Sequence, residues 1–234
     1  MDYHQTPSAV IDVPVATRAT FIRRTYAHLA GSLVVFALIA GLILKTATGV
    51  NLARTMVSGK YSWLVVLGVY MLVSWVASTW AASATRRSTQ YFGLGLFILA
   101  EAVIFSPLLL VATRVDSVII PKAALITAGL FLGLTWIAFS TKKDFSFMAG
   151  FLKLGFLVAL GAIVASIAFG FNLGIIFSVI MVLLLGCSVL YSTSNVIHHY
   201  NTNQDVAASL ALFASFTTML WYIIRILMSL ASDD

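Results

Sequence analysis

Charged residues are scarce in this chain of 234 residues. Only 9% of the residues are Asp, Glu, Lys or Arg, whereas 61% are hydrophobic and the mean hydropathy is +1.01. Soluble domains average about 25% charged residues and about 45 to 50% apolar residues. The composition therefore excludes a water-soluble fold.

Cysteine and a basic face are also lacking. Cys187 is the only cysteine, so an intrachain disulfide is impossible. Lys and Arg outnumber Asp and Glu by 14 to 8, but most of them lie in short segments between long apolar runs. This distribution argues against nucleic acid as a partner and favours a bilayer with anionic headgroups.

Seven apolar stretches are each long enough to cross a bilayer, whose hydrocarbon core of about 30 Å needs about 20 helical residues. Strands of alternating polarity, which are typical of a barrel, do not occur. We therefore predict an all-α polytopic membrane domain over residues 25–230, between an N-terminal extension (1–24) and a short C-terminal tail (231–234). The predicted spans are about 25–44, 61–84, 90–112, 122–140, 149–170, 173–192 and 206–230.

Turn residues and charges give the expected topology. The segment Gly-Phe-Asn-Leu-Gly at 170–174 predicts a turn that divides one long apolar run into two spans, and the polar residues 192–204 predict the next loop. Eight Lys and Arg flank the side of the N-terminus and five flank the other side. This bias favours a cytoplasmic N-terminus.

Glu101 is the only glutamate, and it lies near the centre of the third predicted span. A charge at that depth costs roughly 2.5 to 3.5 kcal/mol, so we expect the side chain to face the bundle interior or a wet cavity. Two interpretations stay open: an ion or proton site, or a structural acid that fixes helix packing. Arg225 is the natural counter-charge, although its side chain could instead extend to the membrane interface.

Two stripes of small polar residues follow helical spacing. They could line a narrow pathway, or they could be hydrogen-bonded contacts between helices. We find no nucleophile motif and no His, Cys, Asp or Glu grouping with metal-ligand spacing, so we expect no enzymatic activity, metal or cofactor. The stripes consist of Ser188, Ser192, Asn195 and His199 in the sixth span, and Ala208, Ala211, Ser215, Thr218 and Tyr222 in the seventh.

Several motifs resemble those of one membrane protein family. Thr-Ala-Gly-Leu-Phe-Leu-Gly-Leu-Thr at 127–135, the Thr-Lys-Lys-Asp-Phe-Ser element that follows, and Glu101 before a Ser-Pro-Leu sequence are similar to the Bax inhibitor-1/YccA family. The C-terminal third resembles its bacterial YccA-like branch, which implies a bacterial inner-membrane protein. The residues of the loop element that match the motif are Thr141, Lys142, Lys143, Asp144 and Ser146.

The resemblance implies a seven-helix fold in which the other six helices surround the last one. It also implies activities proposed for relatives: a pH-sensitive calcium leak in some, and binding and modulation of the membrane protease FtsH in the YccA-like branch. The leak in those relatives depends on two aspartates that share a proton. This chain has Ser192 and Ser215 at those positions, and serine does not titrate in the physiological range.

Our leading hypothesis is therefore a non-enzymatic regulator or binding partner of an FtsH-type protease. The alternative is a leak for calcium or another cation without the aspartate pair. For the leak, the candidate pathway or buried polar residues are Glu101, Ser192, Asn195, Ser215, Thr218 and Arg225. A packing scaffold with neither activity is a third possibility.

Overall fold

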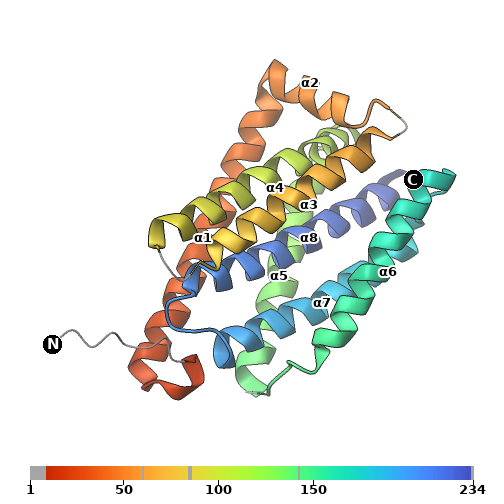
Figure 1. The fold of residues 1–234 in the computed structure, drawn as a ribbon. Coiled ribbons are helices and arrows are strands. Elements are labelled where there is room, and N and C mark those ends of the chain that lie inside the picture. Colours follow the sequence, from red (N-terminus) through yellow and green to blue (C-terminus); the bar gives the residue numbers. More distant parts are fainter. Residues whose placement is uncertain (1–8, 60, 84–85, 142, 233–234) are drawn as a thin grey trace.

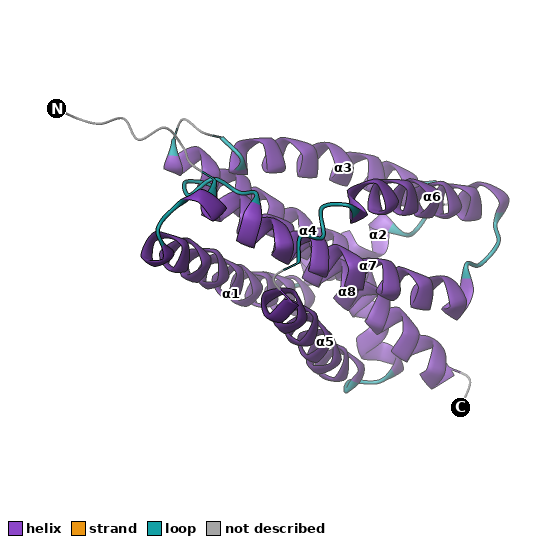
Figure 2. Ribbon diagram, turned by 90° about the horizontal axis from the view of Figure 1, so that it is seen from below, coloured by secondary structure: helices purple, strands orange, loops and turns teal. Residues whose placement is uncertain are grey.

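A computed structural model describes all residues except 1–8, 60, 84–85, 142 and 233–234. Over the described part, the chain forms helices and loops and contains no strand (Figure 2). Seven helices are long and apolar enough to cross a membrane, so the predicted all-α polytopic bundle is confirmed. The elements are η1 (Val10–Asp12), α1 (Val15–Lys45), α2 (Ala47–Met56), α3 (Ser62–Ala81), α4 (Arg87–Val115), α5 (Ile119–Thr141), α6 (Met148–Phe169), α7 (Gly174–His198) and α8 (Asp205–Ser232).

The last helix lies at the centre of the bundle (Figure 1). Helix α8 packs against α1, α4, α5 and α7, and it also contacts α3. Helix α6 lies further out and packs on α7. The most apolar windows of α4 and α8 are each 56% buried inside the protein, against 28% or less in the other five spans. Helices α4 and α8 are therefore the two central helices of the bundle.

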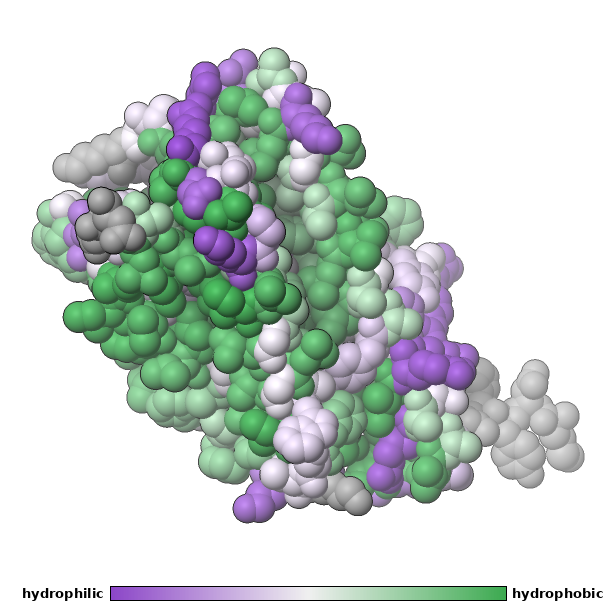
Figure 3. All heavy atoms as spheres, turned by 180° about the vertical axis from the view of Figure 1, so that it is seen from behind, coloured by the Kyte–Doolittle hydropathy of each residue, from purple (hydrophilic) through white to green (hydrophobic). Residues whose placement is uncertain are grey.

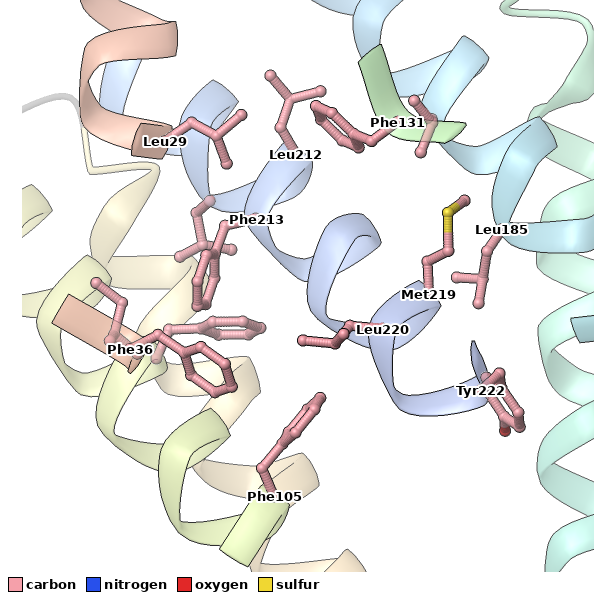
Figure 4. Packing of buried hydrophobic residues seen from close by; sticks show 14 of the residues in the cluster. Leu29, Phe36, Phe105, Phe131, Leu185, Leu212, Phe213, Met219, Leu220 and Tyr222 are labelled. Atoms are coloured by element: carbon pink, nitrogen blue, oxygen red, sulfur yellow. The ribbon is translucent and has the colours of Figure 1, made fainter. Parts of the chain in front are cut away.

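Aromatic side chains fill the contact between the central helices and α1. Phe36 of α1 meets Phe105 of α4 edge-on, with ring centroids 5.1 Å apart, and Phe213 of α8 at 5.9 Å. The three rings point toward one another (Figure 4). Edge-to-face packing is favoured because the positive ring edge meets the negative ring face.

The outer surface of the bundle is apolar. Leu38, Trp75 and Trp136 are each more than 60% exposed. Figure 3 shows a broad hydrophobic area on one face, with hydrophilic side chains gathered toward its margins. Such a surface would be unfavourable in water, but it suits the hydrocarbon of a bilayer.

Local sequence signals explain the breaks between and within helices. The predicted turn at 170–174 is confirmed: Gly170 ends α6 with φ 75° and Gly174 begins α7 with φ 67°, a conformation that favours glycine. Pro107 lies inside α4 and cannot donate a backbone hydrogen bond to the carbonyl of Val103. The hydroxyl of Ser106 donates to that carbonyl at 2.7 Å, so the Ser-Pro pair repairs the gap that the proline makes.

Three boundaries differ from the prediction. Helix α2 was not predicted, because its ten residues include Asn51 and Arg54 and are too few to span a bilayer. Helix α1 begins at Val15, ten residues before the predicted span. The prediction of a loop from residue 192 is wrong as far as His198, because polar side chains on this last stretch of α7 bond to other parts of the protein.

Candidate functional site

The Glu101 carboxylate lies in the middle of the bundle. Its side chain is buried, at 3% exposure, as the sequence predicts. Tyr70 of α3 donates a hydrogen bond to Oε1 at 2.7 Å, and Thr217 of α8 donates to the same oxygen at 3.2 Å. The acid therefore joins three helices. Sequence analysis identified neither partner.

Glu101 also lines a cavity of about 310 Å³. Residues of α3, α4, α6, α8 and the turn between α6 and α7 form its wall. Trp63 and Trp221 stack in this wall with ring centroids 6.0 Å apart. Thr218 and Arg225, both predicted as candidates, contribute to the same wall. The cavity thus holds an acid, a base and several aromatic rings.

Glu101 and Arg225 do not pair directly. Among the described residues, the salt bridges involve other groups, and Arg225 has none. Its guanidinium instead lies 6.0 Å from the ring centroid of Tyr222. Arg225 is partly buried and lines the same cavity as Glu101.

Ser192 and Ser215, at the positions where the resemblance implies an aspartate pair, line a second cavity of about 350 Å³ between α6, α7 and α8. Ser215 forms a hydrogen bond with Ser188 at 3.2 Å, and Ser192 lies one turn away in the same wall. The hydroxyl of Ser215 is also within 3.1 Å of the Ala211 carbonyl. Thr218 borders both this cavity and the one that contains Glu101.

Asn195 lies nearer the end of α7, where it lines a third cavity together with His199 and Ser146. Its carbonyl accepts the backbone N–H groups of His199 and Tyr200, at 2.9 and 3.1 Å, which ends the helix. The candidate residues of α7 and α8 are therefore spread over three cavities. We find no single site that contains all of them.

The family-motif loop packs against the end of α7. The Ser194 hydroxyl accepts the backbone N–H of Phe145 at 2.9 Å, and His199 Nε2 lies 3.0 Å from Asp144 Oδ2. Asp144 Oδ1 accepts the N–H of Ser146 at 2.8 Å. These bonds, led by the one from Ser146, hold the pKa of Asp144 below its ordinary value.

The first three residues of the motif precede this packed turn. Thr141 ends α5 and donates back to the Ile137 carbonyl at 2.9 Å, while Lys142 lies outside the described residues. Lys143 follows it and precedes Asp144 in the loop. The motif thus combines a helix end with an ordered turn.

A charged cluster at the start of α8 was not predicted. Asp205 is fully buried, and Arg87 Nη1 donates to both of its carboxylate oxygens, at 2.7 and 3.0 Å. His28 Nδ1 lies 3.3 Å from Asp205 Oδ2, and His28 Nε2 lies 3.0 Å from the Tyr91 hydroxyl. The partners come from α1, α4 and α8, so no local pattern indicates them.

Within the described residues there is no group of three or more His, Cys, Asp or Glu side chains that could hold a metal ion. The polar groups that the cavity around Glu101 offers to a ligand are one carboxylate, hydroxyl groups and a guanidinium.

Comparison with known proteins decides the family. The model of the family described as "Inhibitor of apoptosis-promoting Bax1" matches residues 18–232. The chain belongs to the Bax inhibitor-1 family. It is 25% identical to Bax inhibitor 1 of Schizosaccharomyces pombe over 100% of this chain and 85% of that protein.

Two bacterial relatives match over part of their length. The chain is 33% identical to the uncharacterized protein PA2604 of Pseudomonas aeruginosa, over 50% of this chain and 52% of that protein. It is 26% identical to an uncharacterized membrane protein of Vibrio cholerae, again over 50% and 52%. The matches therefore span about half the length of these two relatives. This Bax inhibitor-1 family member is a multi-pass membrane protein.

Proposed function

We propose that this Bax inhibitor-1 family member is a non-enzymatic regulator in the bacterial inner membrane that binds an FtsH-type protease. The observation that carries the proposal is that Ser192 and Ser215 line one cavity. The resemblance implies a proton-sharing aspartate pair at these two positions, and neutral hydroxyls cannot supply the pH gate of a leak. A binding role needs no such gate.

The N-terminal segment supports this role. The backbone N–H of Val10 donates to the Tyr200 carbonyl at 2.9 Å, and Arg18 donates to the carbonyls of Val10 and Ile11 at 3.1 and 2.6 Å. The segment around Val10 is thus attached to the connection between α7 and α8. A protease that pulls on the N-terminus would pull on the loop that leads into the central helix.

Co-purification tests this proposal. The tagged protein is isolated from native membranes, and the amount of FtsH-type protease that remains bound is measured together with its activity on a membrane substrate. We expect binding, and we expect deletion of residues 2–8 to reduce it. Arg54→Ala, on α2 at the opposite end of the bundle, is the control and should bind normally. Absence of the protease, with no change in its activity when the chain is deleted, contradicts the proposal.

A cation leak is the second candidate, and the position of Glu101 favours it. A buried carboxylate lines one cavity, and Thr218 borders both that cavity and the one that contains Ser215. Calcium prefers anionic oxygen ligands, and Glu101 offers one such group.

Calcium flux into proteoliposomes tests the leak. Because the serine pair does not titrate, we expect a flux without the steep pH dependence of a carboxylate pair. Glu101→Gln should reduce the flux, and Thr141→Val, outside both cavities, should not. Equal flux in the wild type and Glu101→Gln would remove Glu101 from the pathway.

A further inference from the structure

The Glu101 cavity contains two opposite charges, each without an ionic partner among the described residues. Both hydrogen bonds to Glu101 reach Oε1, from Tyr70 and Thr217, and neither donor is a cation. Arg225 has an aromatic ring beside its guanidinium but no carboxylate. Isolated charges are costly in a membrane interior, and they normally pair or mark a ligand site.

Glu101 and Arg225 line the same cavity without forming an ion pair. Thr217, which donates a hydrogen bond to Glu101, precedes Arg225 by eight residues, or about 12 Å along α8. The Arg225 guanidinium lies 6.0 Å from the ring centroid of Tyr222, three residues back. A ligand with a positive and a negative group a few bonds apart could bridge the acid and the base.

Partly exposed apolar side chains of α3 and α6 line one side of the cavity. Its wall includes Leu67 of α3 and Ile163 and Ile167 of α6. These two helices pack on different neighbours, α3 on α4 and α6 on α7. Helices α3 and α6 are not among the helix pairs that pack closely. The apolar side chains that they contribute to the cavity wall can therefore contact hydrocarbon chains, while Trp63 and Trp221 supply aromatic side chains of the kind that prefer the membrane interface.

We propose that this cavity binds the headgroup of a zwitterionic phospholipid with a primary ammonium group, phosphatidylethanolamine. The ammonium bonds to the Glu101 carboxylate, the phosphate bonds to the Arg225 guanidinium, and the acyl chains leave between α3 and α6. A guanidinium matches a phosphate in shape and charge. Ser166 and Thr218 add hydroxyl groups to the same wall. This inference goes beyond the proposed function and depends on neither protease binding nor ion flux.

Lipid binding to the purified, delipidated full chain tests the proposal. Native mass spectrometry would compare phosphatidylethanolamine with phosphatidylglycerol, which has the phosphate but no ammonium, and with phosphatidylcholine, whose ammonium cannot donate a hydrogen bond. We expect phosphatidylethanolamine to bind about tenfold more tightly than the other two, as the loss of one charge-assisted hydrogen bond implies. Equal binding of all three lipids overturns the proposal.

Single substitutions separate the two halves of the site. Glu101→Gln keeps an oxygen that can accept from Tyr70, so the fold should persist, but the preference for phosphatidylethanolamine over phosphatidylglycerol should disappear. Arg225→Gln should weaken the binding of all three lipids about tenfold, because each carries a phosphate. Arg114→Gln is the matched control, because Arg114 lies in the last turn of α4 and outside the cavity. An unchanged lipid preference in Glu101→Gln contradicts the assignment.

A cavity-filling substitution makes the test independent of charge. Ser166→Phe should occupy the space on the α6 side without touching Tyr70 or Thr217. We expect it to abolish retention of phosphatidylethanolamine while the melting temperature without lipid stays unchanged. Normal lipid retention in this variant would place the lipid elsewhere and overturn the proposal.

Discussion

The hydroxyl of Tyr70 on α3 donates a 2.7 Å hydrogen bond to Glu101 on α4. The two residues are 31 positions apart and lie on neighbouring antiparallel helices. Thr217 adds a longer bond from the central helix α8. The only glutamate of the chain therefore connects three helices through hydrogen bonds, and it also lines a cavity. Both interpretations from the sequence, a binding site and a structural acid, are compatible with this geometry.

Tyr70→Phe should destabilise the protein because it leaves the buried Glu101 without its shortest hydrogen bond. We expect the free energy of unfolding to fall by about 2 kcal/mol, the range for a bond to an ionisable group. Denaturant-induced unfolding in detergent micelles measures the change. Tyr191→Phe, in the wall of the second cavity, is the control, since the Tyr191 hydroxyl makes no hydrogen bond within the part of the chain described. Equal losses in the two variants would contradict this account.

Thr217→Val should have a smaller effect than Tyr70→Phe. The Thr217 hydroxyl has one hydrogen but three acceptors within reach: Glu101 at 3.2 Å and the carbonyls of Phe213 and Ala214 at 3.0 and 3.3 Å. We expect a loss of about 1 kcal/mol. The neighbouring Thr218→Val is the matched control, because its hydroxyl donates only within α8, to Ala214 at 2.7 Å. A larger loss at Thr218 would show that the link to Glu101 contributes little.

Local hydropathy was sufficient to predict the seven spans and the burial of Glu101. It could not identify Tyr70 and Thr217 as the hydrogen-bond donors to Glu101. They lie 31 and 116 residues from the acid, so no local sequence pattern relates them to it. Periodicity placed Ser188 and Ser192 one turn apart on the same face of α7. It could not predict which of the two serines contacts Ser215, because the register of α7 against α8 decides that Ser188 does.

Glycine spacing also does not show where the helices approach each other closely. Gly129 and Gly133 have the four-residue spacing that permits close helix contact, yet both lie in open space on the exposed side of α5. The close approach occurs at Gly93 between α3 and α4 instead. The sequence identifies residues that permit contact, whereas the arrangement of helices determines which of them are used. The burial of Asp205 also depends on the arrangement of helices. The residue lies between the predicted loop and the last predicted span, but it is fully buried.

The pair Arg87 and Asp205 should respond unequally to substitution. Asp205 is fully buried, whereas the Arg87 side chain is 45% exposed. Arg87→Met leaves a buried carboxylate with only His28 nearby, and we expect a loss of about 3 kcal/mol. Asp205→Asn leaves a guanidinium that water can solvate, and we expect about 1 kcal/mol. Unfolding measured in the same detergent compares them, and a reversed order would contradict the burial argument.

Asp144 should make stability depend on pH in the acid range. The N–H of Ser146 and the ring of His199 lower its pKa in the folded state. A lowered carboxylate pKa stabilises the fold above the unfolded pKa of about 4, and this contribution is lost as the pH falls through the folded value. Asp144→Asn should therefore weaken the decline in melting temperature below about pH 4.

The control for this pH experiment is Asp116→Asn. Asp116 also accepts a backbone N–H, from Val118 at 3.1 Å, but it forms no ion pair with any described residue and lies at the opposite end of the bundle. Melting curves at successive pH values compare the variants. If Asp116→Asn changes the acid limb as much as Asp144→Asn, the contacts with Ser146 and His199 are not the cause.

Gly93→Ala should disrupt the contact between α3 and α4. A Cβ atom at this position would lie 2.5 Å from both the carbonyl oxygen of Ala77 and the backbone nitrogen of Ala81, so the helices must move apart. Gly95 lies two residues further along α4, with nothing within 4 Å of its added Cβ. Gly95→Ala should stabilise the helix by about 0.5 to 1 kcal/mol, whereas Gly93→Ala should cost about 1 to 3 kcal/mol. Unfolding measurements that give the two substitutions the same sign would show that the close approach at Gly93 does not hold these helices together.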